Sequence, residues 1–218
     1  MSLKLSDFII QKEGILKEEF CKKVIDKFEK DDRKHDGHIG SGQNQNSNVK
    51  KSTDLLISEL PDWESLDSYV HRIMTSEIKD YLDFFMDSTQ NKQRSDIIDT
   101  GYQVQRTKKG EYYTWHTDDQ YAVIADTYER ETKSADYERR LFTYILYLNQ
   151  GFEGGSTEIV CGPSEDDIIE VVPKTGKLLF FPANNLYVHR GVEVTKGTKY
   201  LMTGWVCDYT DASVYDGM

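Results

Sequence analysis

The chain has few cysteines, and they are not spaced as a disulfide or metal motif. Its 218 residues include three, at Cys21, Cys161 and Cys207, and no two of them form a C-x-x-C pair. An odd number without close pairs argues against a disulfide framework and against a zinc knuckle. We therefore expect reduced thiols, which are typical of a cytosolic protein.

Long apolar runs and an excess of positive charge are also lacking. The N-terminal MSLKLSDFII has no extended apolar segment of the kind found in signal peptides, and no later stretch approaches the length of a membrane span. The formal net charge is −11, so the chain as a whole repels a phosphate backbone and nucleic acid is an unfavourable partner. The expectation is a soluble, cytoplasmic protein.

The chain does have the length and the aromatic residues for a substantial core. Its 218 residues include 14 Tyr and 9 Phe, and we expect one domain over 1–218. Residues 1–96 predict a helical support region, because apolar side chains recur at helical spacing over 17–30 and 62–85. Asp62 is the expected cap of the second helix.

Three histidines of this N-terminal part receive a structural interpretation. Residues 31–51 are rich in Gly, Asn, Gln and Ser and predict a mobile loop, so its His35 and His38 are expected to be solvated rather than metal-bound. His71 lies beside the apolar stripe of the second helix and is also expected to be structural.

From residue 97 onward, apolar and polar residues alternate with period two. Many short runs bounded by Gly, Pro and Asn predict an α+β, mainly β protein, in which residues 97–218 form a double-stranded β-helix (jelly roll) and the N-terminal helices pack on one sheet. The polar insert Asp119–Arg139 is long for a connection and predicts a lid. The expected strands are 8–11, 53–58, 101–106, 112–116, 141–148, 156–160, 168–172, 177–181, 192–194 and 199–207.

One strand carries a pair of potential metal ligands. The stretch EYYTWHTDDQY holds His116 and Asp118, which share a face of a β-strand because they are two residues apart. A third ligand of suitable type, His189, follows in YVHRGVEV. Two His and one carboxylate with open positions form the facial triad of non-haem Fe(II) oxygenases. His-x-Asp alone arises often by chance, so this assignment depends on the downstream sequence.

The last predicted strand carries a lysine whose environment is informative. Lys199, Thr203 and Trp205 share one face of that strand. If the face is internal, the Lys199 ammonium is buried and needs an anion, and neighbouring strands offer no obvious carboxylate. The alternative is that Lys199 lies at the wet end of the strand and extends to solvent. Parity alone leaves both interpretations open.

From about Tyr102 to Asp208, the sequence resembles the catalytic core of 2-oxoglutarate/Fe(II)-dependent dioxygenases, in particular the prolyl 4-hydroxylase-like branch. Five elements match in order: G-x-x-Y-x-x-H-x-D from Gly110 to Asp118, YLN at 147–149, GGST at 154–157, P-x-x-G-x-x-x-x-F from 173 to 181, and H-x9-K from His189 to Lys199. Trp205 matches a tryptophan usual on the last strand.

The resemblance implies Fe(II), 2-oxoglutarate as cosubstrate and O2, and it leaves room for ascorbate. It implies hydroxylation of an unactivated C–H bond, with succinate and CO2 as coproducts. The positions carried over are the iron ligands His116, Asp118 and His189; the 2-oxoglutarate contacts Lys199, Tyr147 and Thr203; and the substrate-channel residues Tyr113, Arg140 and Trp205. Thr107 is a departure, because many relatives have Tyr there to contact the cosubstrate.

Three functions remain open on the sequence. The first is a hydroxylase acting on a prolyl residue of a peptide or protein. The second applies the same chemistry to a free amino acid or other small molecule. The third is a jelly-roll metal-binding or sugar-binding module without turnover, and it leaves Lys199 without an anion. Fold-level analogy does not separate them, and the sequence does not name the substrate or the oligomeric state.

Overall fold

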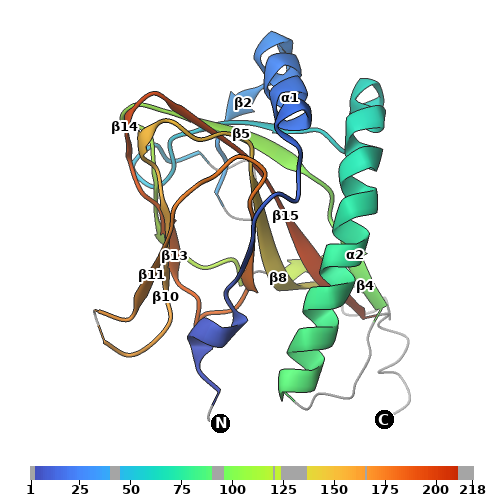
Figure 1. Ribbon diagram of the computed structural model, residues 1–218, viewed down its shortest axis with the longest axis vertical. Coiled ribbons are helices and arrows are strands. Elements are labelled where there is room, and N and C mark those ends of the chain that lie inside the picture. Colours follow the sequence, from blue (N-terminus) through green and yellow to red (C-terminus); the bar gives the residue numbers. More distant parts are fainter. Residues whose placement is uncertain are drawn as a thin grey trace, which may run out of the picture.

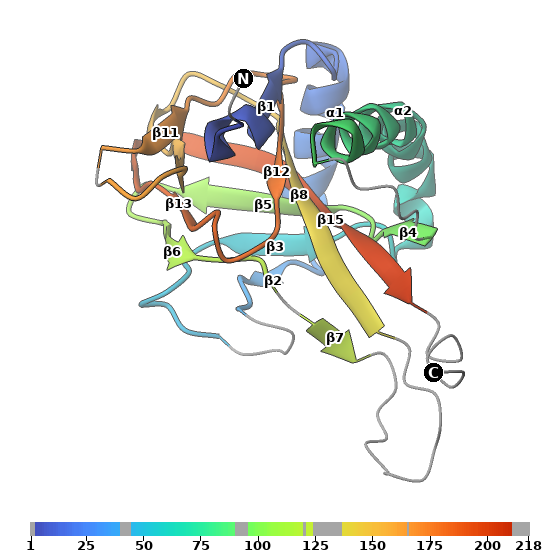
Figure 2. The same ribbon diagram turned by 90° about the horizontal axis from the view of Figure 1, so that it is seen from below.

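The computed structural model describes residues 3–39, 45–89, 96–119, 121–123, 137–164 and 166–210. Two antiparallel sheets face each other across a cavity, and the larger has nine strands in the order β1-β12-β8-β15-β5-β3-β2, with β4 also paired to β15 and β7 to β8. Figure 2 shows these long strands crossing the middle of the molecule. Their bounds are β1 Ile10–Lys12, β2 His35–Asp36, β3 Thr53–Leu56, β4 Asp96–Asp99, β5 Gln103–Lys108, β7 Tyr121–Val123, β8 Tyr137–Tyr147, β12 Leu178–Pro182 and β15 Thr198–Thr210.

The smaller sheet has four strands in the order β11-β10-β13-β6, and a two-stranded piece pairs β14 with β9. Together the sheets form the predicted jelly-roll core. A tight turn at Gly110, whose φ of 81° is readily adopted only by glycine, lies between β5 of the large sheet and β6 of the small one. The bounds are β6 Tyr113–His116, β9 Glu153–Gly154, β10 Thr157–Val160, β11 Ile168–Val171, β13 His189–Gly191 and β14 Val194–Lys196.

Two helices, α1 (Glu18–Lys30) and α2 (Glu64–Thr89), cover the outer face of the large sheet (Figure 1). Short 3-10 turns, η1 (Leu5–Phe8) and η2 (Pro61–Trp63), precede β1 and α2. The apolar stripes of both helices pack on the sheet, as the helical spacing predicts. Among the described residues, neither helix combines the length and the apolarity needed to cross a membrane.

Strand alternation divides the core into two layers. On β8, Phe142, Tyr144 and Leu146 join the cluster beneath the helices, whereas Ile145 and Tyr147 join the cluster between the sheets. The same alternation on β15 sends Met202 and Val206 toward the helices and Leu201 toward the other sheet. Because Lys199, Thr203 and Trp205 share the parity of Leu201, they face the interior between the sheets.

Some predicted elements differ from those observed. Residues 5–8 form η1, and the first strand begins only at Ile10. The predicted strand 192–194 shares only Val194 with β14, while β13 ends just before it, and β4 was not predicted. Asp62 is not a helix cap. Its carboxylate instead pairs with two cations, Lys27 Nζ near the end of α1 and Arg33 Nη1 just after that helix, each at 2.9 Å.

The predicted loop 31–51 is more ordered than its composition suggests. His35 and Asp36 form β2 against β3, and the backbone of Lys50 bridges to Tyr113. The amide of Thr114 donates to the carbonyl of Val49, and the amide of Lys51 donates to that of Tyr112. Residues 49–51 therefore extend the small sheet next to β6. Local composition missed this pairing because it is made with a segment more than sixty residues later in the chain.

The predicted lid falls largely outside the described residues, which omit 120 and 124–136. At its two ends the backbone is paired, since β7 runs antiparallel to the start of β8. Figure 2 shows β7 and this end of β8 projecting from the sheet. A lid over the site stays a prediction.

Candidate active site

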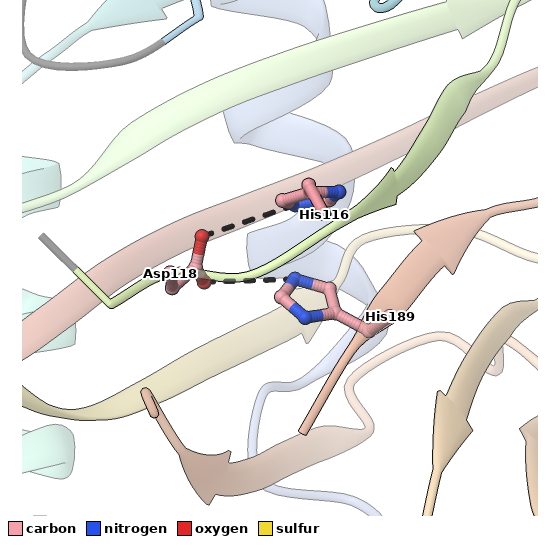
Figure 3. Close-up of side chains that lie close together, drawn as sticks. All are labelled: His116, Asp118 and His189. Atoms are coloured by element: carbon pink, nitrogen blue, oxygen red, sulfur yellow. Dashed lines mark ion pairs between the residues drawn. The ribbon is translucent and has the colours of Figure 1, made fainter. Parts of the chain in front are cut away.

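Two strands of the small sheet bring three potential metal ligands together. His116 ends β6, Asp118 follows it by two residues, and His189 begins β13, which pairs with β6 so that the two histidines are register partners. In Figure 3 the two rings point toward the Asp118 carboxylate. Asp118 Oδ1 lies 3.8 Å from His116 Nε2, and Asp118 Oδ2 lies 3.6 Å from His189 Nε2. One ligand atom from each residue lies within 4.8 Å of the others, a spacing at which one ion can be shared.

Backbone carbonyls fix both imidazoles in the tautomer that a metal needs. His116 Nδ1 lies 2.8 Å from the carbonyl oxygen of Thr114, and His189 Nδ1 lies 3.0 Å from that of Tyr187. Each Nδ1–H can donate to the carbonyl two residues earlier, which leaves the Nε2 lone pair directed at Asp118. Tyr113 also stacks on His116, with ring centroids 3.5 Å apart and planes inclined by 14°.

The surroundings favour the protonation states of a ligand set. Burial, and then His189, lower the pKa of His116 to about 4, so its imidazole is neutral near pH 7. Burial alone would raise the pKa of Asp118, but the two imidazoles and the hydroxyl of Thr143, 2.7 Å from Oδ2, outweigh it and lower that pKa. Asp118 is therefore an anion beside the neutral imidazole of His116.

The three ligands open into a cavity of about 330 Å³ between the sheets. Lys199 reaches it from β15, and the residue is only 4% exposed. Burial lowers the pKa of its ammonium to about 7. Within the described part of the chain, no carboxylate or hydrogen-bond acceptor pairs with Lys199 Nζ, which lies over the Tyr147 ring at 5.6 Å from the ring centroid. Of the two interpretations left open by parity, the structure favours the inward one.

The other predicted site residues lie in or next to this cavity. Tyr113, Arg140, Thr203 and Trp205 line it, and the Arg140 guanidinium stacks on Trp205 at 3.7 Å from the ring centroid. The Thr203 hydroxyl donates to the carbonyl of Tyr144, at 3.0 Å.

Tyr147 lies one layer further back, and its buried hydroxyl donates to Thr157 Oγ1 at 2.7 Å. Thr157 is the member of this pair that lines the cavity. Direct contact of Tyr147 with a cosubstrate stays a prediction, and so does that of Thr203.

Comparison with known proteins agrees with this geometry. Residues 102–207, from the start of β5 into β15, match the sequence model of the 2OG-Fe(II) oxygenase superfamily. This segment of the protein is thus similar to that superfamily. A PKHD-type hydroxylase of Synechococcus sp. (strain CC9605) is 29% identical over 111 residues, which are 50% of this chain and 43% of the relative. The match thus spans less than half of the relative's length.

Several solved structures share the fold at low sequence identity. A prolyl hydroxylase from Trichoplax adhaerens, in complex with a hypoxia inducible factor oxygen degradation domain peptide fragment, has a TM-score of 0.68 at 16% identity, covering 93% of this chain and 84% of that one. The viral collagen prolyl hydroxylase of Paramecium bursaria Chlorella virus-1, in its 2OG complex, has 0.57 at 20%, covering 92% and 96%. A prolyl-4-hydroxylase of Pseudomonas putida has 0.60 at 15%, covering 90% and 91%.

The residues of the cavity fit the two groups that the name of this superfamily implies. Two imidazole nitrogens and one carboxylate suit Fe(II), and three protein ligands are fewer than the six positions of an octahedral ion. The Lys199 ammonium, buried without an acid of its own, suits the distal carboxylate of 2-oxoglutarate. Thr107 is the register partner of Lys199 on β5, and Gln105 Nε2 lies 3.4 Å from the Thr107 hydroxyl, so a short polar side chain occupies this place beside Lys199.

Sequence reasoning missed several residues of the cavity wall. Gln103 and Gln105 line it from β5, and their alternation with buried Val104 was a usable signal. Lys50 and His38 line it from the predicted loop, where composition gave no signal. The His38 ring stacks on His35, with centroids 4.4 Å apart, so His38 is not the freely solvated side chain that was expected.

Arg190 lies between two partners at the edge of the cavity. Its Nη2 is 2.7 Å from Glu158 Oε2, and its guanidinium lies over Trp115, 4.5 Å from the ring centroid. The residue follows a ligand directly in the sequence, yet only the pairing of β13 with β10 shows that Glu158 holds it.

Proposed function

We propose that this protein is a 2-oxoglutarate-dependent dioxygenase that hydroxylates an unactivated C–H bond, with a prolyl residue of a peptide or protein as the substrate. The observation that carries the proposal is the buried Lys199 ammonium, which has no acid partner among the described residues and shares one cavity with the His116–Asp118–His189 cluster. A buried, unpaired cation is costly, and a carboxylate ligand removes that cost. A metal-binding module without turnover gives Lys199 no such partner.

Each residue has a defined task in this proposal. His116 and His189 offer Nε2 lone pairs and Asp118 an oxygen, while the Thr143 hydroxyl holds the Asp118 carboxylate in place. Lys199 binds the distal carboxylate of 2-oxoglutarate. When bound, Fe(II) with 2-oxoglutarate and O2 supplies the oxidising chemistry that an unactivated C–H bond requires, and succinate and CO2 are the coproducts. The two sheets exclude water around the reacting groups.

The prolyl substrate is supported by likeness and by the aromatic side chains that line the cavity. The solved structures named above are prolyl hydroxylases, and one is described in complex with a peptide. The aromatic rings of Tyr113 and Trp205 line the cavity, and they suit an apolar ring such as that of proline.

Anaerobic reconstitution tests the site without knowledge of the substrate. Fe(II) and 2-oxoglutarate are added together, and we expect the visible metal-to-ligand charge-transfer absorption of a chelated 2-oxo acid. Admission of oxygen should then yield succinate from 2-oxoglutarate. The proposal fails if neither the absorption nor succinate formation depends on His189 and Lys199.

Substrate screening separates the two hydroxylase alternatives. A prolyl peptide array and a panel of free amino acids are each incubated with the Fe(II)-loaded protein, and a mass increase of one oxygen is sought. Hydroxylated peptides support the proposal, whereas products found only among the free amino acids assign the small-molecule alternative.

A further inference from the structure

The Asp118 carboxylate is contacted from both sheets. Its two imidazole neighbours, His116 and His189, belong to β6 and β13 of the small sheet. From the large sheet, Thr143 on β8 donates its hydroxyl to Asp118 Oδ2 at 2.7 Å. Carboxylates that ligate a metal are themselves hydrogen-bonded, and such bonds fix the direction in which the oxygen faces the ion. The large sheet thus supports a ligand that follows a strand of the small one.

Trp205 is the cross-strand neighbour of Thr143. The two residues are register partners on β15 and β8, so their side chains leave the large sheet on the same face, and both line the cavity. The Arg140 guanidinium stacks on the Trp205 ring, 3.7 Å from its centroid, and restricts rotation of the indole. Trp205 is therefore directed into the cavity beside the hydroxyl that already holds Asp118.

The indole nitrogen of Trp205 is a buried donor that has no acceptor among the described residues. The other two tryptophans differ, since Trp63 Nε1 donates to Asp31 Oδ2 at 2.8 Å and Trp115 is 39% exposed. A buried N–H without an acceptor is costly. Because Trp205 Nε1 is itself inaccessible to solvent, an entering substrate does not reach it, and its acceptor has to be a protein group already packed beside it.

Asp118 is the acceptor within reach. Burial raises the pKa of its carboxyl, the two imidazoles lower it most, and hydrogen bonding from Thr143 and then from Trp205 lowers it further. The indole nitrogen is thus close to the carboxylate, although it falls short of a complete hydrogen bond. The χ2 torsion of an aspartate is broad, so a small rotation of the carboxylate can complete the bond while the Thr143 hydroxyl follows.

We propose that the Trp205 Nε1–H is a second donor to the Asp118 carboxylate, so that Trp205 and Thr143 together orient this metal ligand from the large sheet. Trp205 is then a positioning residue for the metal as well as a ring in the cavity wall. The inference rests on the metal cluster of the function proposed above, and it deepens that function by showing how one ligand is held.

Mn(II) affinity tests the N–H without a measurement of activity. Trp205→Phe keeps an aromatic ring beneath Arg140 and removes the donor, and free Mn(II) is followed by electron paramagnetic resonance as the ion is titrated into the purified protein. We expect binding about tenfold weaker than in the wild type, as for loss of a group that orients a metal ligand. Binding of 2-oxoglutarate to protein saturated with Mn(II) should not change, because Lys199 is untouched.

Two further variants calibrate this titration. Thr143→Val removes the donor already bonded to Asp118, and it should weaken Mn(II) binding to a similar extent. Trp115→Phe is the matched control, because an arginine, Arg190, also lies over that ring, at 4.5 Å from the centroid, while Trp115 is not part of the cavity wall. We expect wild-type Mn(II) affinity in this control.

The indole N–H resonances report the hydrogen bond directly and need no substitution at Trp205. The three tryptophans of the chain give three 15N–1H indole signals, each assigned from its through-space contacts. Trp63 is the internal reference for an N–H bonded to a carboxylate, and Trp115 is the reference for an exposed one. When diamagnetic Zn(II) is titrated into the wild-type protein, the Trp205 signal should move downfield and its hydrogen exchange should slow, while the other two signals stay in place.

The outcomes separate this inference from the proposed function. Wild-type Mn(II) affinity in folded Trp205→Phe overturns it, and so does an equal loss of affinity in Trp115→Phe. A Trp205 signal that moves only when 2-oxoglutarate or a prolyl peptide is added also overturns it, because the acceptor is then a bound ligand. If Trp205→Phe does not fold, the wild-type resonance decides alone. The proposed function fails on another reading, namely Mn(II) binding that does not need His189.

Discussion

Two lysines are buried in the wall of one cavity, and they differ in whether an acidic side chain pairs with them. Lys50 belongs to the segment that extends the small sheet, and its ammonium is paired with the buried Asp54 carboxylate at 2.7 Å. Lys199 belongs to β15 of the large sheet and has no acid partner among the described residues. A charge that the chain neutralises itself contributes to the fold, whereas a charge left unpaired is completed by a ligand. The two positions should therefore respond in opposite ways to the same substitution.

The largest expected effect belongs to neither lysine. His189→Ala removes one of three ligands and should abolish specific Fe(II) binding and all turnover, because a His and a carboxylate alone form a poor site. Fe(II) content after desalting measures it. Replacing either lysine should leave iron binding intact, and His71→Ala is the control, since that side chain is 59% exposed and lies near Asp99 rather than the cluster. Full iron occupancy in His189→Ala would show that the ligand assignment is wrong.

The next largest effect is on the free energy of unfolding, which should change in opposite directions at the two lysines. Lys50→Met leaves the Asp54 carboxylate buried without its cation and should lower the free energy of unfolding by about 3–5 kcal/mol. Lys199→Met removes an unpaired buried charge and should raise the stability of the ligand-free protein, by roughly 1 kcal/mol or more. Urea unfolding of both variants without 2-oxoglutarate measures the pair. Equal destabilisation by the two changes would contradict the distinction between a paired and an unpaired lysine.

For the affinity of 2-oxoglutarate, the damaging substitution should be the one at Lys199. Lys199→Ala should raise the KM for 2-oxoglutarate by an amount equivalent to about 2–5 kcal/mol, because one member of a buried charged pair is truncated. Lys199→Arg keeps the charge in another shape and should rescue part of the loss. Initial rates of succinate formation measure both. An unchanged KM in folded, iron-loaded Lys199→Ala would mean that another group anchors the cosubstrate, with Arg140 the next to examine, because Arg106 pairs with Glu29 on α1.

The unpaired lysine also predicts how stability depends on pH. Burial lowers the pKa of Lys199 to about 7 in the folded protein, whereas an unfolded lysine has a pKa of about 10.4. Between these values the unfolded chain holds a proton that the folded chain lacks, so the ligand-free protein should gain stability as the pH rises from about 7 to about 10. Lys199→Met should lose this slope, and unfolding midpoints across the range measure it. A slope that is the same in both proteins would assign it to other groups.

The features predicted from sequence are those encoded within a few residues. His116 and Asp118 were found because two residues on one strand share a face, and the inward position of Lys199 was one of two interpretations of the same parity. The helix over 17–30 was found because its apolar spacing is local, and it is observed as α1.

The features that were missed depend on partners far away in the chain. Lys50 lies in a polar segment with no periodicity, and only its pairing with Tyr113 places it in the cavity wall. Asp62 was expected to cap a helix, because its pairing with Lys27 and Arg33 requires the packing of α1 beside η2. The resemblance implied that Tyr147 binds the cosubstrate directly. It did not indicate that the Tyr147 hydroxyl donates to Thr157, the member of this pair that lines the cavity.

The smallest expected effect concerns the hydroxyls near Lys199, and it tests whether Lys199 binds 2-oxoglutarate without their help. Thr203 lines the cavity and donates to the carbonyl of Tyr144, so its hydroxyl has to rotate in order to donate to a carboxylate of 2-oxoglutarate. Tyr147 donates to Thr157, whose own hydroxyl hydrogen is then directed elsewhere and can reach a carboxylate. Thr157→Val and Thr203→Val should each weaken 2-oxoglutarate binding by about 0.5–1.5 kcal/mol, a small fraction of the Lys199 effect. Tyr147→Phe should act only through Thr157, so adding it to Thr157→Val should cost no further affinity. Titration of 2-oxoglutarate into the Mn(II)-loaded variants measures these values, and full additivity of Tyr147→Phe with Thr157→Val would indicate that Tyr147 contacts the cosubstrate directly.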